Sequence, residues 1–545
     1  MKSMKSSYAS TLRLIKKLVL KLKNAVIYAY VKHFSLLFLN NKIKNREKVV
    51  FWMAGGMPGL YDIEAPILLA LRARGYEVHS VICDGVYTAC MLREEKDNVP
   101  VSVWKDRCHA CQEACRKKLD RLSIQHTSIG DYLVKTDLDE LRVESNRITW
   151  SDLDVLEIDG VNLGKVIKES ISRYYQGDLS KIENSVVSEY VFSGLVGHAS
   201  AKNAIKKLSA THWFTSHGVY VDWGGPLLAA LRLNLISATW YSSYRLGQHY
   251  YYHASLKGGD IMFDYNSKKD PNYPNTPVSH QEKSNRVLHY FEERYSSPSA
   301  FQDISLINEP TTEGGLSNYK NFGKKTWCIF THVNWDAGAS FNHMIFNDFD
   351  EWLLETIRVA IRNNSVNWII KIHPHEENYN PNYTLNLIKE SFPILPSHIS
   401  IINHGSKVST RHVLEVIDGC LTVLGTSGLE ALILGKPVIL AGEVHYSNSD
   451  YTYNPPSREE YIALLEKINE IHPLTDNQVR KVHDYAYSFL FEKSIEHQLI
   501  TAYRTADGGV SWHLNFNRLH WLRPNFPSNI KIICESFIYN KPFIV

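Results

Sequence analysis

The fold of this 545-residue chain is decided by the stretch Leu424-Gly425-Thr426-Ser427-Gly428-Leu429-Glu430-Ala431-Leu432. It follows an apolar run and precedes Gly435-Lys436-Pro437-Val438, where a second apolar run begins. A buried strand that ends in small residues and opens into a helix is typical of a parallel α/β unit. The helix N-terminus would offer free backbone N–H groups and a positive dipole end, to which Thr426 and Ser427 add hydroxyl donors. The stretch therefore predicts an anion site.

The same stretch has a simpler interpretation. Ser427-x-x-Glu430 fits a capping box, in which the two side chains only close the first turn of the helix. Capping and phosphate binding can coexist, and the flanking Gly425 and Gly428 favour binding because glycine lets a phosphate approach the backbone closely.

Outward from this stretch, strand-like and helix-like segments alternate in two series. In the second series, strands are predicted at 326–331, 368–372, 399–402, 421–424 and 438–440, and helices at 347–363, 411–417, 427–434, 457–470 and 476–492. In the first, strands are predicted at 48–53, 77–82, 213–216 and 235–239, and helices at 64–74 and near 226–233. This pattern predicts two doubly wound, Rossmann-like α/β domains that face a cleft, where such folds bind their ligands.

The segments divide the chain as follows. We expect a basic arm at 1–47, a first, acceptor-binding domain at 48–300 with a cysteine-rich helical insertion at about 83–200, a linker at 301–324, a second, nucleotide-binding domain at 325–475, and C-terminal helices and a tail at 476–545. A hydrophobic fraction of 44% and a charged fraction of 21% are ordinary for globular domains. A net charge of +3 gives no overall field to attract nucleic acid.

The arm carries most of the charge asymmetry. Residues 1–48 hold twelve Lys and Arg residues and one acid, Glu47. Apolar residues step by three and four from Leu12 to Val26, which predicts a basic amphipathic helix suited to an anionic membrane surface. The alternative is a helix packed on the protein body. No segment reads as a membrane span or a secretory signal, so we expect a cytoplasmic protein peripheral to the inner membrane.

Five of the eight cysteines fall within 33 residues, at Cys83, Cys90, Cys108, Cys111 and Cys115. In a reducing compartment such clustering is typical of a structural zinc site or an iron–sulfur cluster. Cys108, Cys111 and Cys115 also share one helical face, which equally fits a packed helix with small buried residues. The sequence leaves these two interpretations open.

A second candidate site lies at Lys371-Ile372-His373-Pro374-His375-Glu376, just past a predicted strand of the second domain. His373 could donate a hydrogen bond to a phosphate or a base carbonyl, and Pro374 would fix the loop. A histidine that merely closes a turn is the alternative. Because the carboxyl ends of parallel strands share one edge of the sheet, Lys371 and His373 should face the same cleft as Thr426 and Ser427.

These residues resemble a known family. The His-Pro motif, followed downstream by Thr-Ser-Gly-x-Glu-Ala and Gly-Lys-Pro-Val, looks like bacterial capsule and surface-polysaccharide glycosyltransferases of the GT-B fold, over about 325–470. The capsule Kdo transferases are nearest in pattern, and sialyltransferases and CDP-glycerol glycerophosphotransferases share parts of it. The resemblance implies that His373, Thr426 and Ser427 hold the donor nucleotide and that Glu430 contacts its ribose.

Two residues compete as the base that activates the acceptor. His217, in Ser216-His217-Gly218, resembles the His-Gly element of the glycerophosphotransferases, and an imidazole near pH 7 suits the task. Asp84, before Gly85, resembles the acidic motif of sialyltransferases, although Cys83 replaces its first acid. Both dipeptides also suit tight turns. We favour His217.

Polar and aromatic side chains that follow other predicted strands complete the expected cleft. Tyr244 and Arg245 could stack on a sugar and pair with a carboxylate or phosphate, although an aromatic rim is the alternative. His332 and Asn334 follow the first strand of the second domain and are further predicted contacts to the acceptor or a sugar, although polar loops after strands are common.

The sequence therefore predicts a glycosyltransferase that moves a sugar from a nucleotide sugar to a polysaccharide or lipid-linked acceptor, with no cofactor required for catalysis. The alternatives are a CDP-alditol phosphotransferase and a non-catalytic scaffold of capsule assembly. The chain has no Walker loop, Gly-x-Gly-x-x-Gly, His-Glu-x-x-His or Gly-x-Ser-x-Gly motif, which argues against P-loop ATPases, dinucleotide enzymes, zincins and serine hydrolases.

Overall fold

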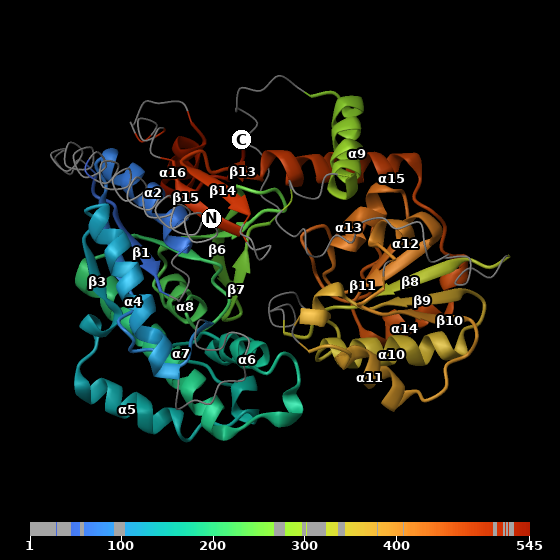
Figure 1. Ribbon diagram of the computed structural model, residues 1–545, viewed down its shortest axis with the longest axis horizontal. Helices are drawn as coiled ribbons and strands as arrows, with labels where there is room; N and C mark the ends of the chain where they lie inside the picture. Colours follow the sequence, from blue (N-terminus) through green and yellow to red (C-terminus); the bar gives the residue numbers. More distant parts are fainter. Residues whose placement is uncertain are drawn as a thin grey trace, which may run out of the picture.

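A computed structural model gives the structure of the chain (Figure 1). It describes Ala29, Arg518, Leu522 and residues 45–54, 59–91, 104–265, 278–296, 301, 323–335, 344–378, 380–406, 408–504, 510–515 and 528–545. The predicted amphipathic helix from Leu12 to Val26 lies outside this part of the chain, as do most of the predicted arm and most of the predicted linker. None of the described helices is long and apolar enough to span a membrane.

The first domain is built on an eight-stranded sheet in the order β13-β6-β5-β4-β1-β2-β3, with β7 paired to β6. The five strands from β3 to β5 are parallel, and β6, β7 and β13 run antiparallel to their neighbours. The strands are β1 (Lys48–Met53), β2 (Glu77–Ile82), β3 (His126–Ser128), β4 (His212–Ser216), β5 (Ile236–Ser242), β6 (Gln248–Lys257), β7 (Asp260–Phe263) and β13 (Ile495–Glu496).

The second domain has a five-stranded, wholly parallel sheet in the order β10-β9-β8-β11-β12. Its strands are β8 (Thr326–Phe330), β9 (Asn367–Lys371), β10 (Ile399–Ile402), β11 (Gly419–Thr422) and β12 (Val438–Leu440). In both sheets the first strand of the domain is thus central. The next strands are added outward on one side of it, and the later strands are added on the other side. In such an order the crevice that takes a ligand opens at the carboxyl ends of the strands beside the first one.

Helices connect and cover the strands of both sheets. The first domain uses α2 (Leu60–Ala73), α4 (Trp104–Arg121), α5 (Lys135–Ser145), α6 (Leu163–Tyr174), α7 (Asn184–Leu208) and α8 (Gly224–Arg232). The second uses α10 (Phe349–Arg362), α11 (Tyr383–Ser391), α12 (Thr410–Val416), α13 (Thr426–Ile433) and α14 (Arg458–Glu466). One large apolar core unites the first domain with one face of the second sheet, and a smaller core lies under α10 and α14.

The C-terminal segment returns to the first domain. α9 (His280–Ser296) and α15 (Asp476–Tyr487) pack together on the second domain, and the chain then crosses back to place β13, the hairpin β14 (Ile500–Arg504)–β15 (Val510–Leu514) and α16 (Asn529–Ile538) against the first (Figure 1). α16 packs on α2 and β5, and β13 adds an edge to the first sheet beside β6. The predicted C-terminal helices and tail are therefore part of both domains.

The predicted α/β class with two Rossmann-like domains is confirmed. The stretch 83–200 differs from the expected helical insertion, because it contains β3, which pairs in parallel with β2. α4 is the crossover helix between these two strands, and α7 leads into β4, so both belong to the doubly wound fold itself. The three-residue β3 is too short and polar to be recognised in the sequence.

Candidate functional site

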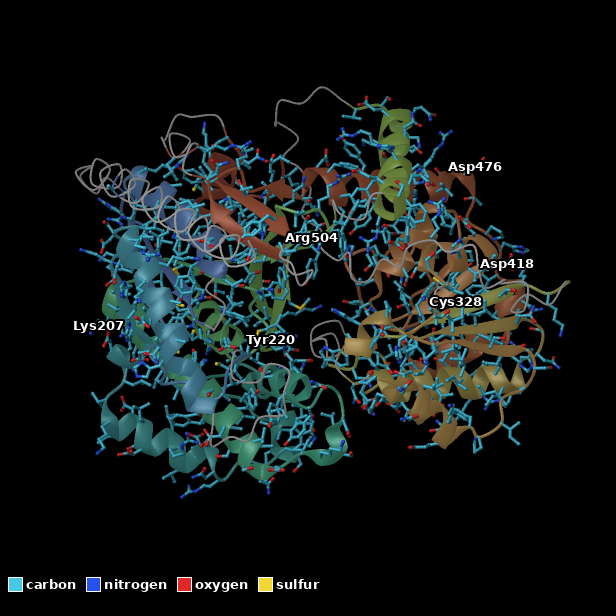
Figure 2. All side chains as sticks on the ribbon, in the orientation of Figure 1. Lys207, Tyr220, Cys328, Asp418, Asp476 and Arg504 are labelled. Carbon is cyan, nitrogen blue, oxygen red and sulfur yellow. The ribbon has the colours of Figure 1, made fainter. Side chains whose placement is uncertain are left out.

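The carboxyl ends of the two sheets face each other (Figure 1). Asp418, which precedes β11, lies at the edge of the second domain far from the first, and Tyr220, which follows β4, lies on the side of the first domain that faces the second (Figure 2). The loops that carry the predicted site residues therefore converge between the domains.

The N-terminus of α13 is the centre of the predicted donor site. Gly425 is the N-cap, with extended backbone and no side-chain cap, so the expected capping box does not form. Gly428 N–H turns back to the carbonyl of Gly425 at 3.0 Å. Within the described part of the chain, neither the backbone N–H nor the hydroxyl of Thr426 or Ser427 has a hydrogen-bond partner, and both residues are partly exposed. Four donors are thus available to an anion.

His332 joins the end of β8 to the loop that opens α13. Its Nε2 accepts the backbone N–H groups of Val423 at 3.1 Å and Leu424 at 3.0 Å, and lies 2.9 Å from the hydroxyl of Thr422. The ring stacks on Phe349, and burial lowers the pKa of His332 to about 3, so the imidazole is neutral. The Thr422 hydroxyl in turn accepts Gly425 N–H at 3.1 Å. His332 thus sets the shape of the loop, and its predicted contact with a sugar stays a prediction.

The side chain of Tyr446 also holds the loop that opens α13. The hydroxyl of Tyr446 donates to the carbonyl of Gly425 at 2.5 Å. A Cβ on Gly428 would lie 2.3 Å from this hydroxyl and 3.2 Å from Cγ2 of Thr422. Glycine at 428 is therefore required by the close approach of the Tyr446 side chain, and the predicted approach of a phosphate stays a prediction.

His373 has a defined tautomer. Its Nδ1 accepts the backbone N–H of His375 at 3.2 Å, so the proton of the neutral ring sits on Nε2. The backbone N–H of His373 donates to the hydroxyl of Thr331 at 3.0 Å, which fixes the loop at the end of β9. Burial, with smaller contributions from His332, His375 and Lys371, lowers the pKa of His373 to about 3. His373 can therefore present a neutral N–H donor, as the sequence predicted for a nucleotide contact.

Two other predicted donor residues are engaged inside the fold. The ammonium of Lys371 is buried and donates to the carbonyl of Val408 at 3.2 Å, and burial lowers its pKa. The carboxylate of Glu430 is 2.9 Å from Nε of Arg294 and accepts the hydroxyl of Tyr295 at 2.7 Å. Glu430 thereby ties α13 to α9, and its predicted ribose contact would have to compete with these partners. Pro374 begins the short helix Pro374–Asn378 behind His373.

His217 is in an unusual backbone conformation. Its φ is +44°, and Gly218 follows with φ +81°. The ring stacks on Trp223 with centroids 5.3 Å apart, and its Nδ1 contacts the hydroxyl of Ser216. A non-glycine residue held in the left-handed region costs about 1–3 kcal/mol, and such strain concentrates at functional sites. Burial and the charge of Arg173 lower the pKa of His217 to about 4, so the expected match to pH 7 is absent.

The remaining acceptor candidates differ in their surroundings. The Asp84 carboxylate lies beside Gly130, where a Cβ would be 2.5 Å from its Oδ2. Arg245 pairs with Glu293 of α9 at 2.7 Å, and the guanidinium of Arg294 lies 5.5 Å from the ring centroid of Tyr244. Tyr244 and Arg245 thus pack against α9, as the predicted aromatic rim would.

The cysteines of the predicted metal site lie around α2 and α4. Cys115 is in the core, and Cys83 and Cys111 pack against it. Burial raises the pKa of Cys83 to about 12, whereas a hydrogen bond from Cys111 lowers that of Cys115 to about 7. Cys90 is buried and Cys108 partly exposed. Within the described residues, no three His, Cys, Asp or Glu side chains are placed to hold a metal ion, so zinc or an iron–sulfur cluster stays a prediction.

Sequence reasoning missed Thr331 and Thr422, and it placed Tyr446 on the cleft side without its bond to Gly425. Thr422 stands three residues before Gly425, a spacing at which a threonine hydroxyl commonly accepts a backbone N–H. That signal was available in the sequence. Tyr446 and Thr331 act on loops that are distant in sequence, and only the assembled sheet brings them there.

One comparison with known proteins covers the part of the chain that carries the α13 loop. Residues 324–466 match the family model described as capsule polysaccharide biosynthesis protein. The predicted resemblance, drawn from the motifs at His373 and Thr426, is therefore confirmed over the second domain. No curated protein matches the chain.

Solved structures give only weak likenesses. KpsC of Thermosulfurimonas dismutans, a β-Kdo 2,4-transferase, is 12% identical, with 58% of this chain and 87% of that chain covered and a TM-score of 0.31. The UDP-GlcNAc 2-epimerase of Neisseria meningitidis is 11% identical, with 81% and 96% covered and a TM-score of 0.25. The spinosyn rhamnosyltransferase SpnG is 9% identical, with 82% and 96% covered and a TM-score of 0.25.

Proposed function

We propose that the chain is a glycosyltransferase of capsule or surface-polysaccharide synthesis, which transfers a sugar from a nucleotide-sugar donor to a saccharide acceptor. The observation that carries the proposal is the N-terminus of α13, where Thr426 and Ser427 offer donors that no described residue accepts, beside the carboxyl ends of β8 and β11. The capsule family match covers this helix, which supports the same assignment.

The proposed chemistry is electrostatic stabilisation of a leaving phosphate. As the bond between the sugar and the donor phosphate breaks, negative charge grows on the phosphate oxygens. The N–H groups and hydroxyls at 426–427 and the Nε2–H of neutral His373 would meet that charge without rearranging. We propose that this reaction needs no cofactor, because donors of the chain itself bind the leaving group.

The acceptor hydroxyl must lose its proton during the transfer. His217 and Asp84 remain the two proposed bases, each near the carboxyl end of a strand of the first sheet. The strained backbone of His217 supports a functional role, whereas its pKa of about 4 makes it a weak base at neutral pH.

The first experiment is a thermal-shift panel of CMP, CDP, UDP, GDP and their sugars on the full-length protein. A ligand at a hundred times its dissociation constant stabilises a fold by about 2.7 kcal/mol. We expect one nucleotide to stabilise the wild type and to lose this effect in Ser427→Ala and His373→Ala. A nucleotide that stabilises all three proteins equally would place its site elsewhere.

Product analysis then separates the proposal from its alternatives. A sugar transferred without new phosphodiester supports a glycosyltransferase, whereas a new phosphodiester identifies a CDP-alditol phosphotransferase. A folded protein that binds no nucleotide of the panel would favour a scaffold of capsule assembly.

We further propose that the basic segment 1–47 attaches the protein to an anionic membrane surface, because it holds eleven Lys and Arg residues and one acid. Removal of residues 1–44 should move the protein from the membrane fraction to the supernatant. An unchanged membrane fraction would overturn this part of the proposal.

A further inference from the structure

A cavity of about 970 Å³ lies between the domains and shares no lining residue with the α13 site. From the first domain it is lined by α6 and residues 177–181, and from the second by residues 347–350, where α10 begins, and by α11. The volume is at the upper end of the ~300–1,000 Å³ that ligand sites span. The cavity is therefore large enough for more than one sugar ring.

The two domains touch at one side of this cavity. The hydroxyl of Ser172 donates to the backbone carbonyl of Asn334 at 3.1 Å. Gly177 has φ +82°, and a Cβ there would lie 2.4 Å from the Cβ of Asn334. A glycine thus allows the first domain to approach the loop after β8, and the cavity depends on this approach.

The lining has the chemistry of a neutral polyhydroxylated ligand. It contains four asparagine amides, Tyr383 and Trp150, and it holds six carboxylic acids against two lysines. Lys168 already pairs with Asp154, and Lys181 with Asp178. Amides both donate hydrogen bonds to hydroxyls and accept them, and carboxylates accept them, whereas the excess of acids opposes an anion.

A hydrogen-bonded triad fixes the polar groups of one wall. Asp350 accepts the amide N–H of Asn334 at 2.5 Å and the hydroxyl of Tyr383 at 2.6 Å. The Asn334 amide is thereby oriented with its nitrogen toward the carboxylate, which turns its oxygen away as an acceptor. Burial raises the pKa of Asp350 to about 6, so the carboxylate is ionised at pH 7 and both donors are needed to satisfy it.

We propose that this interdomain cavity binds the acceptor through uncharged hexose or N-acetylhexosamine units and disfavours acidic sugars. The inference rests on the proposed transferase function and adds the chemical class of the acceptor. Asn334, predicted from the sequence as an acceptor contact, is the residue that the proposal places at the meeting point of both domains.

The test measures saccharide binding to full-length protein by ligand-observed NMR, with chitotriose, maltotriose and trigalacturonate as probes. We expect a neutral trisaccharide to bind, trigalacturonate to bind at least tenfold more weakly, and Tyr383→Phe and Asn386→Ala each to weaken the neutral probe severalfold. Tyr453→Phe is the matched control, because Tyr453 is exposed on the second domain outside the lining, and it should change nothing.

Binding of the nucleotide found in the thermal-shift panel is measured on the same variants. Three saccharide results, each with nucleotide binding retained, would overturn the acceptor proposal alone. These are no binding of a neutral saccharide, a preference for trigalacturonate, and equal binding of the neutral probe by the wild type and both cavity variants. Absence of nucleotide binding, with the saccharide results as expected, would overturn the transferase proposal and leave a saccharide-binding cavity. Melting curves establish that each variant is folded.

Discussion

The Nε2 atom of His332 accepts the backbone N–H of Leu424 at 3.0 Å, a bond that spans 92 positions of the sequence. It connects the loops that follow two adjacent strands, β8 and β11, at the point where the order of the second sheet reverses. The turn at α13, which is the proposed anion site, is therefore shaped by a residue that need not touch the ligand.

We expect His332→Ala to weaken nucleotide binding at least tenfold. Two backbone N–H groups would lose their acceptor, which costs about 1–3 kcal/mol for each buried group, and the loop would relax. His398→Ala is the control, because it also removes a hydrogen bond between a histidine ring and the backbone, here the carbonyl of Ala360. His398 lies just before β10, at the amino ends of the strands and away from the α13 loop. Equal losses of affinity in both variants, by calorimetric titration, would contradict a local role for His332.

We expect Gly428→Ala to destabilise the second domain and abolish nucleotide binding, because the new Cβ would displace the Tyr446 hydroxyl. Tyr446→Phe removes that hydroxyl and should recover part of the stability when combined with Gly428→Ala. The measurement is a double-mutant cycle by chemical denaturation. Additive effects of the two substitutions would show that Tyr446 is not the obstacle.

We expect Glu430→Ala to lower the free energy of unfolding by about 3–5 kcal/mol, because it leaves the buried Arg294 guanidinium without its carboxylate. The double variant Glu430→Leu with Arg294→Met should recover much of this loss, since neither charge remains buried. Stability is measured by denaturant titration. If instead Glu430→Ala were as stable as the wild type and only weakened nucleotide binding, the ribose contact implied by the resemblance would be its main role.

The pH dependence of kcat/KM tests His217 as the base. Because burial lowers its pKa to about 4, the imidazole is already unprotonated throughout the neutral range. We therefore expect kcat/KM to be flat on the acid side from pH 7 down to about pH 5, and His217→Ala to lower it by about 10²–10⁴-fold. An acid limb near pH 6.5 that disappears in His217→Ala would show that the ring titrates normally in the enzyme.

The parts of this fold that could be predicted are those determined by neighbouring residues in the sequence. The strands at 48–53 and 77–82 were predicted with the bounds that the structure gives, because each is a compact apolar run bounded by charged or glycine-rich turns. β6 was missed, since its buried Tyr250, Tyr251 and Tyr252 break the expected alternation. The two-residue β13 exists only through its pairing with β6, a tertiary contact that leaves no periodic signal.

The candidate site divides in the same way. The positions of Thr426, Ser427 and His373 just past strands of the second sheet could be predicted, because each strand and the loop after it are consecutive in the sequence. The link from His332 to the α13 loop could not, because it depends on β8 and β11 becoming neighbours. The partners of Glu430, Arg294 and Tyr295, could not be predicted either, because they belong to a helix more than a hundred positions earlier. Its ribose contact, implied by the resemblance, stays a prediction.

The return of the C-terminal segment sets an order for folding during synthesis. β13 and α16 complete the first domain, although the ribosome makes them after the whole second domain. The second sheet, from β8 to β12, is contiguous in the sequence and can close as soon as it emerges. The first domain is thus translated first but completed last. Until β13 and α16 are made, the face of α2 and the edge of β6 on which they pack would have to be covered by other contacts.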